Sequence, residues 1–177
     1  MTTDLQKFPI GKFQKPPVIT HQLIQQWIEE IAVFPEQLAK EVRHLTDEQL
    51  NTPYRPGGWR IRQVVHHCAD SHMNSLVRFK LALTEDTPTI KPYYEDRWAE
   101  LPDSKTLSVE ASLQILQGLH YRWVVLLKSL TEHDLQRTFI HPEHGQQITL
   151  NENIGIYAWH GKHHLAHITT LKQRMGW

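Results

Sequence analysis

Residues 157–168 read YAWHGKHHLAHI, so four histidines fall within eight consecutive positions. A helix turns by about 100° per residue, which places four rings on one face about a quarter of a turn wide: His160, His163, His164 and His167. One buried histidine on such a face is usually a hydrogen-bonded core residue. Four rings are different, because each neutral imidazole in a core needs both a donor and an acceptor. The stripe therefore predicts a metal ion, which takes one nitrogen from several rings at once.

The spacing of these histidines indicates which two of them can bind the same metal ion. Two imidazoles four residues apart on a helix reach one ion. The pairs His160/His164 and His163/His167 both have this spacing, and the three-residue step from His160 to His163 is a weaker option. Spacing alone does not choose between them.

A third ligand has to come from another element, and residues 66–72 (HHCADSH) offer it. His72 lies on the apolar stripe of this predicted helix, while His66 and His67 flank the stripe on opposite sides. Either flank can face a neighbouring helix, so periodicity leaves the choice open. Cys68 shares the stripe, which is more typical of a small buried hydrophobic residue than of a ligand.

The catalytic base is not part of the histidine motif. The His-Glu-x-x-His pattern of zinc proteases carries its own glutamate, and Gly161 stands at that position here. The chain is therefore not a protease of that class. A base has to come from another element, with Asp70, Glu95 or Asp96 as candidates, and Asp70 is a weak one because an exposed helix carboxylate explains it equally well.

Apolar residues recur at steps of three and four along four segments, which predicts amphipathic helices. The predicted helices cover residues 20–45, 59–83, 109–130 and 151–175. The strings LTDEQL at 45–50 and LTEHDL at 130–135 each follow a long helix, so the four helices form two similar halves. This pattern predicts an all-α fold, a four-helix bundle. Pro35 is expected to bend the first helix or split it near Phe34, since proline removes one helical hydrogen bond. Asn151 is expected to cap the last helix.

The segments between the helices add three predictions. Residues 8–19 contain three prolines and predict an extended arm, within an N-terminal segment 1–19. Residues 86–106 lack a clear period and predict a long ordered connection, which would let the halves pack with a non-adjacent topology. Residues 138–141 and 147–150 predict a small β-hairpin around the turn Glu143-His144-Gly145, before the last helix.

Composition restricts the class of protein. The length of 177 residues is typical of one domain, 1–177. The chain has 19 basic and 19 acidic residues, and this balance argues against a nucleic-acid partner. One cysteine excludes an internal disulfide, and the lack of a long apolar run predicts no membrane partner and a cytoplasmic location.

Several longer strings are similar to a known family. They are PYRPGGW at 53–59, RQVVHH at 62–67, DSHMN at 70–74 and RMGW at 174–177, together with the histidine stripe. These strings resemble the YfiT-type proteins of bacilli, a branch of the DinB-like superfamily of four-helix-bundle metalloproteins. The similarity extends over the whole chain, so the resemblance predicts a single domain of this type.

The resemblance implies one divalent metal per chain, zinc or nickel, held by His67, His160 and His164. It further implies a cytoplasmic homodimer and a metal-dependent hydrolase that activates water against a small-molecule substrate. Related members transfer thiols such as bacillithiol or mycothiol, so a thiol S-transferase is the alternative, and a non-enzymatic metal-binding bundle is a third interpretation. Under the three-ligand interpretation, His163, His167 and His72 are expected around the ligands or in the pocket wall. Because histidine binds metal only when neutral, metal affinity is expected to fall below a pH of about 6.5.

Overall fold

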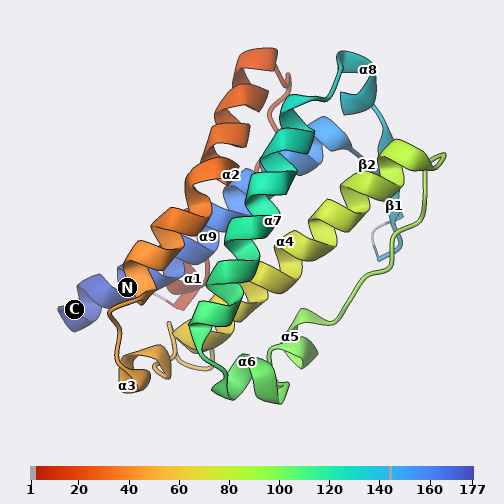
Figure 1. The fold of residues 1–177 in the computed structure, drawn as a ribbon. Helices are drawn as coiled ribbons and strands as arrows, with labels where there is room; N and C mark the ends of the chain where they lie inside the picture. The colour runs from red at the N-terminus through yellow and green to blue at the C-terminus, as the bar shows by residue number, and fades with distance from the viewer. Residues whose placement is uncertain (1–2, 144) are drawn as a thin grey trace.

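Four long helices dominate the computed structural model, which describes residues 3–143 and 145–177 (Figure 1). They are α2 (His21–Val42), α4 (Ile61–Thr84), α7 (Val109–Lys128) and α9 (Leu150–Met175). Both α2 and α4 pack against α7 and α9, so α2 lies diagonally across the bundle from α4, and α7 lies diagonally across from α9. The predicted four-helix bundle and its non-adjacent topology are confirmed. Within the described ranges, no helix is both long and apolar enough to cross a membrane.

Short elements connect the four helices. They are α1 (Thr3–Lys7), α3 (Asp47–Leu50), α5 (Glu95–Trp98), α6 (Pro102–Thr106), α8 (Glu132–Leu135), β1 (Thr138–His141) and β2 (Gln146–Thr149). The two strands pair antiparallel, which confirms the hairpin with its second strand one residue earlier than predicted. His144 of the predicted turn lies outside the described residues.

Two segments predicted without helices contain short ones. The N-terminal segment 1–19 is not extended throughout, because α1 occupies part of it, and the connection 86–106 contains α5 and α6. Helices of four or five residues span less than two turns, so no apolar period can repeat within them. This is why periodicity did not detect them.

Two predicted helix boundaries are also corrected. The helix α2 runs without a break through Pro35, so the predicted split is wrong. The N-cap residue of α9 is Thr149 rather than Asn151, because β2 ends in an extended residue and the helix follows it directly. Asn151 lies in the first turn, where its Oδ1 accepts a hydrogen bond from Thr149 Oγ1 at 2.5 Å.

The core consists of two apolar clusters, one toward each end of the bundle. One contains Phe79 and Trp123, and the other contains Leu38 and Ile61. Along each long helix, the residues of one cluster precede those of the other. Buried histidines of α4 and α7 lie between the two clusters, so a polar layer crosses the middle of the core.

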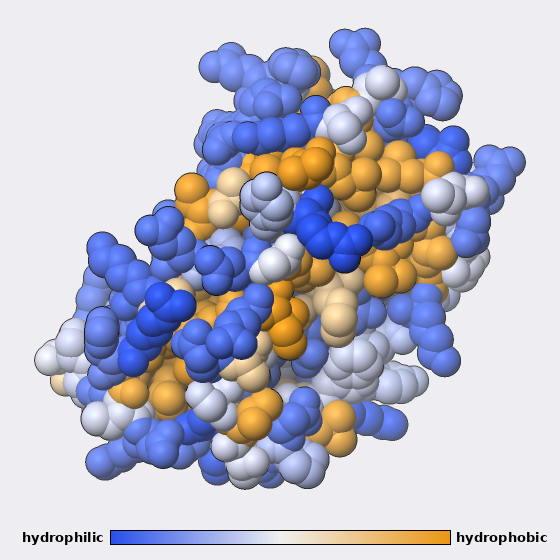
Figure 2. All heavy atoms as spheres, viewed as in Figure 1, coloured by the Kyte–Doolittle hydropathy of each residue, from blue (hydrophilic) through white to orange (hydrophobic). Residues whose placement is uncertain are grey.

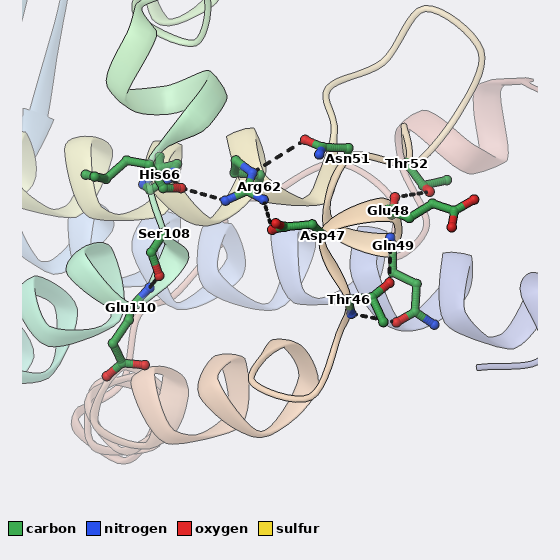
Figure 3. Close-up of polar contacts among 11 residues, drawn as sticks. Thr46, Asp47, Glu48, Gln49, Asn51, Thr52, Arg62, His66, Ser108 and Glu110 are labelled. Atoms are coloured by element: carbon green, nitrogen blue, oxygen red, sulfur yellow. Dashed lines mark hydrogen bonds and ion pairs between the residues drawn. The ribbon is translucent and has the colours of Figure 1, made fainter.

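Arg62 fixes the start of α4, the helix that carries the 66–72 histidines (Figure 3). Its Nη2 donates to Asp47 Oδ1 at 2.6 Å, and its Nη1 donates to the Leu107 carbonyl at 2.6 Å. The Arg62 side chain is buried, although the Asp47 side chain is exposed, and charge-assisted bonds of this kind are stronger than bonds between neutral groups. Arg62 thereby ties α3, α4 and the segment before α7 together.

Small residues allow α9 to approach α2 closely. A Cβ added at Gly155 would lie 2.7 Å from the Trp27 ring, and one at Gly161 would lie 2.9 Å from the Phe34 ring. Both rings are buried and have little room to move. The two glycines therefore set the separation of α2 from the helix that carries the histidine stripe.

Replacing Gly155 with alanine is expected to lower the free energy of unfolding by about 1–3 kcal/mol, because the methyl group overpacks against Trp27. Gly118 is the matched control, since it lies inside α7 with nothing within 4 Å of an added Cβ. There, alanine should raise stability by up to about 1 kcal/mol through helix propensity. Urea unfolding of both variants checks this, and a stabilised Gly155→Ala protein would show that α2 and α9 can separate freely.

The face formed by α2 and α7 carries exposed apolar side chains (Figure 2). Val33 of α2 and Tyr121 and Val125 of α7 are among them. Tyr121 and Val125 line a hollow of about 790 Å³ between the two helices. The hollow contains none of the histidines predicted as metal ligands. The functional site therefore has to be sought on another side of these helices.

Candidate metal centre

Three histidines from two helices meet at one point. His67 comes from α4, and His160 and His164 come from successive turns of α9. One ring nitrogen of each lies within 4.8 Å of one ring nitrogen of the others. The Nε2 atoms of His67 and His160 are 3.2 Å apart. This separation lets one ion contact both nitrogens, which normally lie about 2.0–2.1 Å from zinc.

The other histidines of residues 66–72 point elsewhere. His66 Nδ1 lies 2.7 Å from Ser112 Oγ of α7, and its Nε2 lies 3.3 Å from the Leu107 carbonyl. His72 is fully buried behind the three-histidine cluster, and its Nε2 is 3.0 Å from His160 Nδ1. Cys68 is fully buried in an apolar cluster, and burial raises the pKa of its thiol. Of the candidate ligands in residues 66–72, the structure thus brings His67 into the three-histidine cluster.

A cavity of about 580 Å³ opens beside the three histidines. Its wall includes the rings of Trp59, Tyr157 and Trp159. Residues of the connection before α4 (Tyr54, Arg55, Gly57 and Gly58) and of the predicted connection 86–106 (Pro92, Tyr93, Glu95 and Asp96) also line it. Lys7 and Phe8 of the N-terminal segment also line it, as do His141 and Glu143 of the hairpin. The sequence did not indicate these last contributions, because each residue is isolated from the histidine motifs and has no spacing relation to them.

His163 and His167 lie in the same cavity but form other contacts. Because the Lys7 carbonyl only accepts, His167 Nε2 carries a hydrogen and donates to it at 3.0 Å. The Tyr54 ring stacks on His167 with centroids 3.9 Å apart, and Trp159 stacks on His163 at 4.5 Å. These two histidines form the part of the wall that holds the N-terminal segment.

The three clustered histidines are held in the neutral form. Burial lowers the pKa of His67 to about 3, and the neighbouring His163 and His167 contribute to the shift. Burial also lowers the pKa values of His160 and His164 well below the ordinary value, with smaller effects from the surrounding histidines. At neutral pH each ring therefore has a lone pair available, as a metal ligand requires.

The candidate bases differ in position. Glu95 and Asp96 line the cavity, whereas Asp70 is not part of its wall. Partial burial raises the pKa of Asp70 to about 6, and the charge of Asp103 adds to the effect. The cavity wall therefore contains the α5 carboxylates Glu95 and Asp96 together with Glu143 of the hairpin, and not Asp70.

Clustered neutral histidines inside a four-helix bundle define a class of metalloprotein fold, and the sequence shows which family it is. The pattern of the DinB superfamily matches residues 25–168, and the chain belongs to this family.

Relatives at higher identity share nearly the full length. A protein of Bacillus mycoides (strain KBAB4) is 57% identical over 171 residues, covering 97% of this chain and 98% of its own, and is named "Putative metal-dependent hydrolase". A protein of Bacillus cereus (strain 03BB102) has the same identity, coverage and description. The solved structure of YfiT from Bacillus subtilis matches 98% of this chain and 99% of its own, with 50% identity and a TM-score of 0.96. It is described as "a probable metal-dependent hydrolase with an unusual four-helix bundle topology".

Proposed function

We propose that this chain is a metal-dependent hydrolase in which His67, His160 and His164 hold one divalent ion. The observation that carries the proposal is the meeting of three neutral imidazoles at the wall of a 580 Å³ cavity. A volume of this order is typical of small-molecule sites. The descriptions of the relatives support the same activity.

Imidazole ligands suit both zinc and nickel. We propose zinc, with nickel as the alternative, because three histidines with an open position are a known catalytic zinc site. Structural zinc sites have four protein ligands, whereas three histidines leave a position open for catalysis. Neither His163 nor His167 belongs to the group of ring nitrogens that lie within 4.8 Å of one another, which argues against a fourth histidine ligand. We therefore favour a catalytic site with an open coordination position over a structural metal site that only stabilises the bundle.

The chemistry follows from charge and position. A divalent ion held by three neutral histidines acidifies water to a pKa of about 7. The histidines add no negative charge that would weaken this effect, and the rings of Trp59 and Trp159 restrict the cavity. Of the three predicted bases, Glu95 and Asp96 line the cavity and Asp70 does not, so among these three we assign the proton acceptor to Glu95 or Asp96.

A substrate screen tests the proposal. Protein loaded with zinc or nickel is offered carboxylic esters, amides and phosphoesters, each with and without bacillithiol. We expect thiol-independent hydrolysis in at least one class, abolished by chelation and reduced at least about 100-fold in His164→Ala. His66→Ala is the matched control, since His66 faces Ser112 and should leave turnover unchanged.

The screen also separates the alternatives. Turnover only with bacillithiol would replace the hydrolase by a thiol S-transferase, in which the same ion stabilises a thiolate. Metal binding without turnover of any substrate, and with His163 or His167 required for it, would favour a non-enzymatic bundle. The homodimer and the cytoplasmic location implied by the resemblance stay predictions, tested by light scattering and by cell fractionation.

A further inference from the structure

Three hydrogen bonds connect the candidate metal centre to the backbone of α2 through buried imidazoles. His120 Nδ1 lies 2.7 Å from the Ile31 carbonyl, and His120 Nε2 lies 2.8 Å from His72 Nδ1. His72 Nε2 then lies 3.0 Å from His160 Nδ1. The chain of bonds passes from α2 through α7 and α4 to α9, so it joins all four long helices.

The acceptor at the start of this chain exists because of Pro35. In a helix, the carbonyl of residue 31 normally accepts from the N–H of residue 35, and proline has no N–H. Pro35 lies inside α2 four residues after Ile31. The Ile31 carbonyl therefore lacks its ordinary helical donor, and His120 supplies one instead.

A carbonyl only accepts, so the direction of every bond follows from the first. His120 Nδ1 must carry a hydrogen, and because burial keeps this ring neutral its Nε2 has a free lone pair. His72 Nδ1 must then donate to it, which leaves His72 Nε2 as an acceptor. His160 Nδ1 in turn donates to His72, and His160 Nε2 is left without a hydrogen.

This bare Nε2 is the His160 atom that lies 3.2 Å from His67 Nε2 in the three-histidine cluster. A metal-bound histidine usually donates its other N–H to a carboxylate or a carbonyl, which fixes its tautomer and orientation. Here the accepting carbonyl is that of Ile31, and the His72 and His120 rings lie between it and His160. We propose that His120 and His72 are positioning residues. Through their hydrogen bonds, the Ile31 carbonyl fixes the tautomer and orientation of the His160 ring, so that the His160 Nε2 lone pair points at the metal position. The proposal rests on the proposed metal site.

The tautomers can be observed without any metal. Long-range ¹H–¹⁵N spectra of the uniformly labelled, metal-free protein at neutral pH distinguish a protonated from a bare ring nitrogen. We expect the hydrogen on Nδ1 in His120, His72 and His160 alike. A His160 ring with its hydrogen on Nε2 would overturn the proposal, whatever the metal affinity.

Substitutions at His120 test the effect on binding. His120→Leu fills the space without a donor or acceptor, and removing such a partner typically weakens metal affinity about 10–100-fold. His120→Gln keeps one donor and one acceptor and should recover most of the affinity. In the Leu variant, His160 should also lose its single tautomer.

Asn153→Leu is the matched control for general damage to the bundle. Asn153 is buried on α9 and donates to Ser75 Oγ at 3.2 Å, so its loss removes a buried hydrogen bond outside the chain of imidazoles. Its zinc affinity should equal that of the unsubstituted protein. Unchanged affinity in His120→Leu overturns the positioning role alone, whereas no zinc binding by the unsubstituted protein overturns the proposed site.

Discussion

Replacing His160 with alanine should lower zinc affinity at least about 100-fold. Structural zinc sites bind with about 10–16 kcal/mol, so one ligand accounts for about 3 kcal/mol, and 1.4 kcal/mol corresponds to a tenfold change. His160 shares its position with His67 and His164, and we expect alanine at either of them to have a similar effect. The measurement is metal content by mass spectrometry on tag-free protein, followed by zinc titration.

His163→Ala is the control within the same helix. The His163 ring contacts Trp159 and Phe8 and lies outside the three-histidine group, so its loss should leave about one equivalent of zinc bound. Equal losses in His163→Ala and His160→Ala would point to a closed site with a fourth histidine. Less than about a tenth of an equivalent in the unsubstituted protein, after zinc is offered, would rule the site out.

Acidification should unfold the metal-free protein between about pH 6.5 and pH 5. Eight of the described histidines have a lowered pKa in the folded chain: His66, His67, His72, His120, His160, His163, His164 and His167. Below pH 6.5 the unfolded chain binds protons that the folded chain does not, so stability falls as the pH falls. The loss is complete only when the pH passes the folded values, about 3 for His67 and about 4 for His120.

The expected size of this effect is large. At pH 5 each histidine whose folded pKa lies well below 5 destabilises the fold by about 2 kcal/mol, from 1.36 kcal/mol per pKa unit. A few such residues offset much of a typical stability of about 5–15 kcal/mol. Asp70 acts in the opposite direction, because its raised pKa of about 6 favours proton uptake by the folded chain.

Circular dichroism against pH, in the presence of a chelator, measures the midpoint. Saturating zinc should move it to lower pH, because a ligand at 100 times its Kd adds about 2.7 kcal/mol of stability. An equal unfolding free energy at pH 7 and pH 5 would contradict the prediction. The sequence alone predicted that protons compete with the metal for the ligands below about pH 6.5. Because the folded chain lowers the pKa values of these rings, they stay neutral at that pH. We therefore expect the metal to be released only when the chain unfolds.

The bundle was predictable because its helices are long enough to repeat an apolar period several times. The same signal placed four histidines on one face of the last helix. It could not choose His67 over His66, since each lies at the edge of the stripe and the choice depends on which helix packs there. That packing follows from the topology, in which α2 lies diagonally opposite α4 and α7 lies diagonally opposite α9, and no local pattern encodes this arrangement.

The role of His120 was hidden for a different reason. One histidine on the apolar side of a helix is typical of a satisfied core residue, and His120 is one in part. Its partner is the Ile31 carbonyl that Pro35 leaves free, 89 positions away in the sequence. A proline inside a helix was interpretable from the sequence only as a disruption, whereas in the folded chain it provides an acceptor.

The wall of the cavity is built partly from a segment that the bundle does not need. Lys7 and Phe8 line the cavity, and the segment is held there by the bond from His167 to the Lys7 carbonyl and by one from Trp159 Nε1 to the Gly11 carbonyl at 3.2 Å. Neither core cluster includes a residue before Ile19. Substitutions at Lys7 and Phe8 can therefore alter which molecules are accepted while the scaffold keeps its stability. Selection on substrate range can act on these first residues independently of selection on the fold.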